Sequence, residues 1–290
     1  MDIRVLRYFV TIAEELNFSH AAARLHVSQP ALSRQIAELE SQLGTKLFVR
    51  GNRQIQLTQD GYYLQEQANE ILKLVDKTTF NLQKQDTISG VLDIGAGESI
   101  ALRPMMTAIQ KVIYQNPEIK VNIHSGDSLN TLAELDSGVL EFSAMMGDKK
   151  YENYHSLKFP AVNHWGVLMR KDEQIASLDE ISPTDLVGRP LITSRQSQTS
   201  EFFEEWSHGL SLQYNYIGTY NLIFNAMLLV ETGACMALTY ESLIDTTNTE
   251  LVFKRLSPSL TEGASLIWSK KRKLPEAGQL FIEQLKKELE

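Results

Sequence analysis

Apolar residues near the start of the chain recur at helical spacing. Leu32, Ile36, Leu39 and Leu43 follow one another at intervals of four, three and four residues, which predicts a single buried stripe on a helix. The small and polar positions lie off this stripe: Gln29, Pro30, Ser33, Arg34 and Ala37. The pattern therefore predicts a helix with one side in a core and the other side open to a partner.

A shorter helical segment precedes this one, and a tight turn separates the two. Ser19 is the expected N-cap of the short helix, and the chain turns at His26-Val27, with Val27 facing the core. Ser28 is placed to cap the second helix, with Pro30 in its first turn, where a missing N–H costs little. The arrangement over about 18–37 is a helix-turn-helix, whose second helix fits a DNA major groove.

The residue types on the polar side suit contacts with DNA. Gln29 can pair with adenine, Arg34 with guanine or phosphate, and Pro30 can touch a thymine methyl group, while the small Ser33 lets the helix sit deep. Alternating residues over about 47–57 predict a β-hairpin wing with Arg50 and Arg53 near its tip, suited to phosphates or the minor groove. The candidate DNA-binding residues are Ser28, Gln29, Pro30, Ser33, Arg34, Arg50 and Arg53. The alternative is a three-helix interaction domain with a solvated polar face.

A second apolar repeat follows the wing on a long predicted helix. Thr58 is its expected N-cap, and the chain to about residue 84 lacks proline. Heptad spacing places these residues on one seam: Leu64, Ala68, Ile71, Val75, Thr78 and Leu82. A seam of this kind packs either against its own chain or against a second copy of the helix.

From residue 91 the pattern changes to short apolar runs that alternate with helical segments. Strands are expected at 91–97, 119–124, 142–146, 165–169, 190–193, near 239 and at 266–268, and helices at 101–115, 129–137 and 276–289. Such alternation is typical of an α/β architecture with largely parallel sheets. The chain is expected to leave a first subdomain near Pro160 and to return to it near residue 265.

Composition and charge narrow the functional classes. The 290 residues include one cysteine, Cys235, which excludes an internal disulfide framework and favours a reducing cytoplasm. The N-terminal segment lacks the features of a signal peptide, and no apolar run reaches the roughly 20 residues that span a membrane. The net charge is −8, but residues 1–60 carry seven basic and six acidic side chains, so the acidic excess belongs to the remainder. The charge distribution is compatible with DNA binding by the N-terminal end.

Enzyme and metal sites find little support in the residue pattern. Gly95-Ala-Gly97 lacks the third glycine of a dinucleotide loop, and His124, Asp127 and Ser128 are too close in sequence for triad geometry. His155, His164 and His208 lack the spacing of metal ligands, so neither a metal nor a cofactor is expected. Cys235 lies in an apolar run and is expected to be a buried, inert thiol, with Met145, Met146 and Trp165 in the core.

Motifs spread over the first sixty residues resemble those of the LysR-type transcriptional regulators. The matching residues are Leu6-Arg7-Tyr8-Phe9, Asn17-Phe18-Ser19, Ala21-Ala22, Leu25, Val27-Ser28-Gln29-Pro30-Ala31-Leu32-Ser33-Arg34-Gln35-Ile36, Leu39-Glu40, Leu43-Gly44, Leu47-Phe48, Arg50, Arg53, Leu57-Thr58 and Gly61. The resemblance implies a winged helix-turn-helix over 1–58, a dimerising linker helix over 59–88 and an effector-binding domain over 89–290. That domain would resemble periplasmic binding proteins, with subdomain I at about 89–160 and 265–290 and subdomain II at about 161–264.

The same resemblance implies a small-molecule site between the subdomains. It would involve hydroxyl groups in three loops, and the residues at matching positions are Ser99, Ser128, Ser194, Gln198, Thr199 and Phe202. Hydroxyls and backbone N–H groups at helix starts suit a carboxylate, to which Arg195 can add charge pairing. Any one of these serines could equally serve as a plain helix cap.

These expectations combine into a regulator that binds an inverted-repeat promoter as a dimer or tetramer and senses a small metabolite of unknown identity. RNA polymerase is a further candidate partner, and no membrane is expected. The competing hypothesis is a solute-binding module or enzyme whose N-terminal helices serve only for assembly.

Overall fold

The computed structural model describes residues 1–50, 55–82, 88–147, 149–198 and 202–290. The chain forms two compact units, Met1–Lys84 and Gln85–Glu290, each of which is described by itself. None of the helices in the described part is long and apolar enough to cross a membrane.

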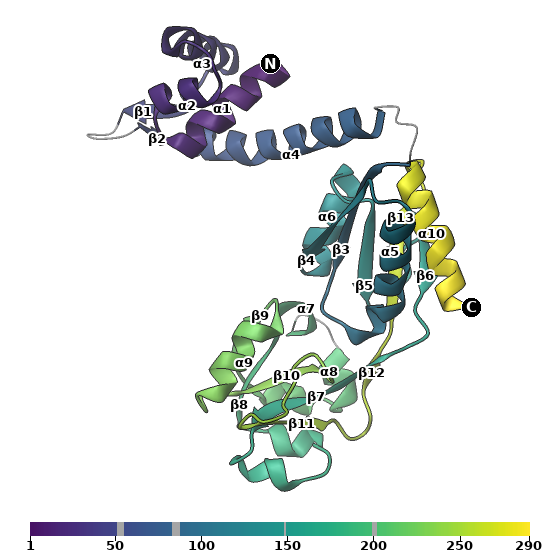
Figure 1. The fold of residues 1–290 in the computed structure, drawn as a ribbon. Coiled ribbons are helices and arrows are strands. Elements are labelled where there is room, and N and C mark those ends of the chain that lie inside the picture. Colours follow the sequence, from purple (N-terminus) through teal and green to yellow (C-terminus); the bar gives the residue numbers. More distant parts are fainter. Residues whose placement is uncertain (51–54, 83–87, 148, 199–201) are drawn as a thin grey trace. The chain divides into compact units, whose positions relative to one another are not determined.

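Three helices, a hairpin and a long helix make up the first unit (Figure 1). They are α1 (Ile3–Glu15), α2 (Phe18–Arg24), α3 (Gln29–Leu43), the antiparallel strands β1 (Phe48–Arg50) and β2 (Ile55–Leu57), and α4 (Gln59–Leu82). Phe9, Ile12 and Leu32 are fully buried between them. The helix-turn-helix and wing expected from the pattern are both present, although the wing tip lies outside the described residues.

Helix caps explain where these helices begin. Ser28 caps α3 by accepting a hydrogen bond from the Ala31 N–H, and Thr58 caps α4 by accepting one from the Gly61 N–H at 2.9 Å. The expected cap at Ser19 is wrong, because Asn17 accepts from the backbone N–H groups of both Ser19 and His20.

The buried stripe of α3 is shorter than its spacing predicts. Leu32, Ile36 and Leu39 are buried as expected, but Leu43 is 43% exposed. Leu43 is the last residue of the helix, before Gly44 turns the chain in a left-handed conformation, and it extends beyond the core.

The second unit contains two sheets, each with helices against both faces. In subdomain I the strand order is β4 (Ile119–Ser125), β3 (Gly90–Ala96), β5 (Phe142–Met146), β13 (Ala264–Ser269) and β6 (Tyr154–Lys158). Helices α5 (Arg103–Gln115) and α10 (Glu276–Leu289) pack on one face through Met105 and Phe281, and α6 (Ser128–Ser137) packs on the other through Leu135.

Subdomain II has the strand order β11 (Leu251–Arg255), β7 (Asn163–Arg170), β10 (Met236–Tyr240), β8 (Pro190–Ser194) and β9 (Asn215–Tyr220), with β12 (Thr261–Glu262) also paired to β7. Helix α8 (Phe202–Trp206) packs on one face against Trp165, and α9 (Ile223–Glu231) packs on the other against Leu168. The short helix α7 (Arg195–Gln198) follows β8 directly.

The prediction of largely parallel sheets is wrong in detail. Strands β3, β4 and β5 pair in parallel, as do β8, β9 and β10, but β7 and β13 pair antiparallel with their neighbours. Both β7 and β13 begin directly after the chain has passed from one sheet to the other, between Lys158 and Asn163 and between Glu262 and Ala264. A strand that enters from the opposite subdomain is free of the helical crossover that makes neighbours parallel.

Candidate functional site

The outer side of α3 forms an exposed polar surface. Gln29, Pro30 and Arg34 are exposed and Ser33 is half-buried. The Gln29 Nε2 donates to Ser33 Oγ at 2.8 Å, so these two side chains are already oriented along the same side of the helix. Their opposite side is held by the buried Leu32, Ile36 and Leu39. The surface is thus rigidly backed and offers both donors and acceptors.

Ion pairs reduce the basic charge that is available beside this surface. Arg24 pairs with Glu14 and Glu15 at 2.7 and 3.1 Å, and Lys46 pairs with Glu40 at 2.6 Å. Arg34 has no ion pair with any described residue. Arg50 contributes its backbone to β1, but its side chain is not among those that the structure describes. Arg53 lies outside the described residues. Among the described side chains, Arg34 is therefore the basic residue that lies on the polar side of α3.

One of these ion pairs also fixes the wing. Glu40 is 8% exposed and accepts hydrogen bonds from the backbone N–H groups of Leu47 and Phe48 at 2.9 and 3.3 Å. Burial raises the pKa of its carboxyl, but Lys46 and the two N–H groups outweigh burial and lower it overall. Sequence reasoning missed this role, because a glutamate within a helix usually faces solvent.

The apolar seam of α4 packs mainly on its own unit. Ala68 is fully buried in the core of the first unit, and Leu64 and Ile71 pack against it. Val75 is half-buried, and the side chain of Leu82 is outside the description. Packing on the same chain accounts for Leu64, Ala68 and Ile71, because α1 covers that side of the helix. Pairing with a second copy stays a prediction for the rest of α4.

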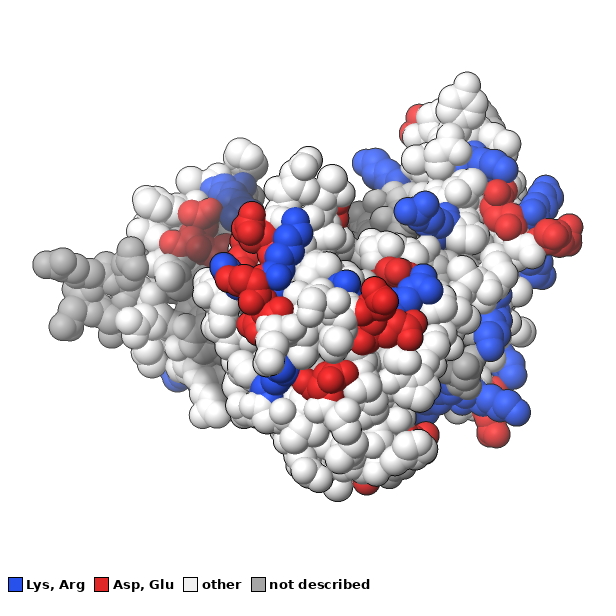
Figure 2. Space-filling model, turned by 90° about the horizontal axis from the view of Figure 1, so that it is seen from below, with Lys and Arg blue, Asp and Glu red and all other residues white. Residues whose placement is uncertain are grey.

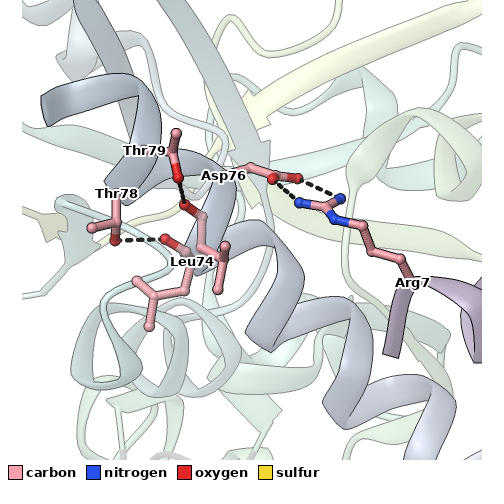
Figure 3. A network of polar contacts seen from close by, with 6 residues as sticks. Arg7, Leu74, Asp76, Thr78 and Thr79 are labelled. Atoms are coloured by element: carbon pink, nitrogen blue, oxygen red, sulfur yellow. Dashed lines mark hydrogen bonds and ion pairs between the residues drawn. The ribbon is translucent and has the colours of Figure 1, made fainter. Parts of the chain in front are cut away.

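Toward its end, α4 makes an ion pair with α1 and side-chain hydrogen bonds to its own backbone (Figure 3). Arg7 of α1 forms an ion pair with Asp76, while the hydroxyls of Thr78 and Thr79 donate to the carbonyls of Leu74 and Val75 at 2.7 and 2.9 Å. The Arg7–Asp76 pair is solvent-exposed and contributes little stability by itself. The apolar packing on α1 is therefore the main contact that holds α4 on the first unit.

A cavity of about 510 Å³ lies between the two subdomains of the second unit. Subdomain I lines it with the loops after β3, β4 and β5, and subdomain II lines it with the start of α7 and the ends of β9 and β10. The parallel strands point their carboxyl ends at this space, which is where open α/β sheets bind ligands.

The predicted effector residues fall into three groups. Ser128, Ser194 and Phe202 line the cavity. Ser99 is not among the described residues of its wall, since its hydroxyl donates to Asn163 Oδ1 at 2.7 Å and also accepts from the Ala101 N–H to cap the 3₁₀ turn Ile100–Leu102. Gln198 ends α7 with its side chain outside the description, and Thr199 lies outside the described residues. The ligand contacts of all six stay predictions.

Three carboxylates in the cavity wall were not singled out from the sequence. Glu98 accepts a hydrogen bond from the Ile223 N–H at 2.7 Å and so caps α9 from the opposite subdomain. Asp127 accepts from the Asn130 N–H at 3.0 Å and caps α6. Glu262 accepts from Trp165 Nε1 at 3.0 Å and from the Tyr240 hydroxyl at 2.6 Å. Glu98 and Asp127 lay in loops that the resemblance indicated, but the expected ligand contacts there were the neighbouring hydroxyls of Ser99 and Ser128.

Aromatic rings cover the subdomain II side of the cavity. The rings of Trp165 and Tyr240 have centroids 4.4 Å apart, and Phe202 packs against Trp165. Burial, followed by the charge of Glu262, raises the pKa of Tyr240 well above its usual value. The phenol therefore stays protonated at neutral pH and donates its hydrogen bond to Glu262. Trp165 and Met146, expected as core residues, also form part of this wall.

Residues considered for enzyme chemistry have other contacts. His124 Nε2 lies 3.7 Å from Asp93, Asp127 caps α6, and the Ser128 N–H donates to Gln196 Oε1 at 3.4 Å. Within the described residues no group of three His, Cys, Asp or Glu side chains is placed to hold a metal ion. Cys235 is 3% exposed, and burial raises the pKa of its thiol, as expected of an inert cysteine.

Comparisons with known families and proteins match both units. The model described as "Bacterial regulatory helix-turn-helix protein, lysR family" matches residues 3–62, and that described as "LysR substrate binding domain" matches residues 85–290. A hydrogen peroxide-inducible genes activator of Pectobacterium carotovorum is 32% identical over 66% of this chain and 64% of its own length. The transcriptional regulator XapR of Escherichia coli is 34% identical over 48% of this chain and 49% of its own. The chain thus spans less than two thirds of the length of these curated relatives.

Solved structures share the fold at lower identity. Full-length CbnR in complex with its target DNA aligns over 99% of this chain and 100% of its own, with a TM-score of 0.76 and 21% identity. HinK, a LysR family transcriptional regulator from Pseudomonas aeruginosa, aligns over 99% of this chain and 98% of its own, with a TM-score of 0.57 and 22% identity.

Proposed function

This chain belongs to the LysR family, and on that premise we propose that it is a sequence-specific DNA-binding transcriptional regulator rather than an enzyme. Its first unit binds promoter DNA in the cytoplasm, and its second unit senses a small molecule. The exposed polar side of α3, carrying Gln29, Pro30, Ser33 and Arg34, is the observation that carries the proposal. CbnR, which shares the fold, is bound to target DNA in one of its structures.

The recognition helix would be α3, with its polar side in the major groove. Gln29 and Arg34 are the side chains suited to base edges, and Ser28 and the wing are suited to phosphates. The binding unit carries a nearly neutral net charge over residues 1–60, so a single copy has few phosphate contacts to offer. Two copies reading an inverted repeat double those contacts on the same DNA, which raises affinity without new chemistry.

The second unit carries exposed apolar surfaces that suit assembly into a dimer or tetramer. At the edge strand β4, Ile123 is exposed, and Met106 and Ile113 are exposed on the adjacent α5. At the edge strand β9, Ile217 is exposed beside Phe224 and Leu228 of α9. A twofold axis that pairs the β4 edge of one copy with the β9 edge of the other covers both apolar surfaces on both copies.

Effector binding in the cavity would change how the copies assemble on DNA. A ligand can shift such an equilibrium only through different affinities for the two states. Glu98 and Gln196 already link the two subdomains across the cavity, so a ligand there alters the angle between them. Peroxide sensing through an internal disulfide is not supported, since a disulfide needs two thiols and this sequence has one cysteine.

The decisive experiment is binding of the purified full chain to fragmented genomic DNA of its source, followed by titration on the enriched sequence. We expect a motif with dyad symmetry and an affinity that falls steeply with salt. Arg34→Ala should weaken binding about tenfold or more and relax the sequence preference at the base pair that Arg34 contacts. Lys271→Ala, an exposed cation of the second unit, is the matched control. Full, selective affinity in Arg34→Ala would exclude α3 as the recognition helix, and salt-independent binding would favour the solute-binding alternative.

A further inference from the structure

We propose that the cavity takes a cationic effector, a protonated organic amine on an apolar skeleton. The inference rests on the proposed function, since it concerns the effector site of the second unit. It departs from the carboxylate suggested by the hydroxyl residues at the helix starts. The reason is that side chains of the protein itself already accept hydrogen bonds at the helix starts facing the cavity.

Helices α6 and α9 each bring an N-terminus to the cavity wall, and each carries a carboxylate there. Asp127 caps α6 through the Asn130 N–H at 3.0 Å, and Glu98 caps α9 through the Ile223 N–H at 2.7 Å. At α7, Ser194 Oγ accepts from the Ser197 N–H at 3.2 Å. An anionic ligand would have to approach two negative charges in order to reach these N–H groups, whereas a cation is attracted by both.

Glu262 adds a third carboxylate, oriented by the aromatic wall. The hydrogen bonds that it accepts from Trp165 and Tyr240 come from neutral donors and orient the carboxylate at the cavity wall. On the same wall the Trp165 ring packs against Tyr240 and Phe202, with centroids 4.4 and 6.1 Å away. Aromatic faces carry partial negative charge and attract ammonium groups, most strongly in a desolvated site.

The basic residues at the cavity do not reverse its sign. Lys149 and Arg195 are both exposed, so water and salt screen their charges, whereas Glu98, Asp127 and Glu262 are half-buried. Lys149 Nζ lies 5.9 Å from the centre of the Tyr151 ring, itself a cavity residue. The ammonium group of Lys149 thus already lies over an aromatic face at the rim of the cavity. The remaining apolar wall, Met146 and Leu243, suits a hydrocarbon skeleton.

The test compares probes of equal skeleton and opposite charge on the full chain. Phenethylamine is paired with 3-phenylpropanoate and 1,4-diaminobutane with hexanedioate, and binding is measured by thermal shift and calorimetry. We expect amines to raise the melting temperature and their matched carboxylates to leave it unchanged. Glu98→Gln and Glu262→Gln should each weaken amine binding about tenfold or more, since each removes a charged partner. Glu118→Gln removes an exposed carboxylate outside the cavity and should change nothing.

Three outcomes would overturn the proposal: a carboxylate that binds better than its paired amine, no stabilisation by either amine, or amine binding that persists in both cavity variants. Glu98→Gln keeps the test valid if Glu262→Gln loosens the Trp165 and Tyr240 side chains. DNA affinity of the same samples without probes reports on the first unit separately. A carboxylate that binds in the cavity would therefore overturn the cationic effector and leave the regulator intact.

Discussion

Glu40 is the residue whose charge is best placed to affect the first unit. Replacing it by Gln keeps its shape but removes the charge that Lys46 and the N–H groups of Leu47 and Phe48 contact. We expect Glu40→Gln to lower the free energy of unfolding by about 1 to 3 kcal/mol, measured by urea denaturation. Glu38→Gln, on the exposed side of the same helix, should change it by less than about 0.5 kcal/mol.

The contribution of Glu40 also depends on pH in a defined direction. Its folded pKa is lowered, so the stabilisation is complete above the unfolded value of about 4.3 and disappears as the pH falls through the folded value. The difference in unfolding free energy between the wild type and Glu40→Gln should therefore shrink in acid. A constant difference from pH 7 to pH 3 would mean that Glu40 acts through shape alone.

Individual residues were predictable from the sequence where a local rule governs them. Ser28 and Thr58 are caps because a hydroxyl precedes each helix, and Cys235 is buried because its neighbours are apolar. Glu98 and Glu262 are 164 residues apart in sequence, and no local pattern places both in one cavity wall. Their roles depend on which strands become neighbours, which only the fold determines.

At the scale of elements, Gly61 shows how closely α4 packs on the wing. A Cβ at this position would lie 2.2 Å from the Leu47 carbonyl oxygen, a backbone atom that cannot rotate away. We expect Gly61→Ala to destabilise the first unit by about 2 kcal/mol in thermal or chemical unfolding. Gly218→Ala is the control, since the nearest atom to its added methyl lies at 4.0 Å. Equal melting temperatures for both variants would show that α4 can shift away from β1.

The periodic helices were predictable, and the strands were predictable only in part. Helices α5, α6 and α10 lie within two residues of the expected bounds. Strands β6, β9 and β11 were missed, because β6 and β9 contain no fully buried position and β11 contains one, so no buried apolar run marks them. The heptad spacing of α4 identified the apolar seam correctly for Leu64, Ala68 and Ile71. Spacing does not identify the partner, and α1 of the same chain proves to cover the seam as far as Ile71.

For the whole molecule, the distribution of charge and apolar surface governs assembly. On the face drawn in Figure 2, acidic and basic side chains lie beside one another on a largely uncharged surface. Mixed charges of this kind neither repel nor orient a second copy strongly. The proposed assembly relies instead on the exposed apolar side chains at the edges of β4 and β9.

Charge placed in one of these edges should prevent assembly. Phe224 is 61% exposed on α9, so Phe224→Glu should leave the fold intact and shift the oligomer to a smaller species in light scattering. Leu212→Glu changes a residue that is 76% exposed outside both edges, and it should leave the mass unchanged. An unaltered mass for Phe224→Glu would leave α4 as the main contact between copies.

The double crossing between the sheets has a consequence for the order in which the protein can fold during synthesis. The first unit is synthesised before the second, and the residues of its core all lie within it. Subdomain II is complete once β12 has been made. Subdomain I, although it begins earlier, lacks the interior strand β13 and the helix α10 until subdomain II has been synthesised. Its half-finished sheet must wait, with the Phe142 side of β5 uncovered, while the subdomain inserted within it folds. This makes β3, β4 and β5 the segments in greatest need of a chaperone.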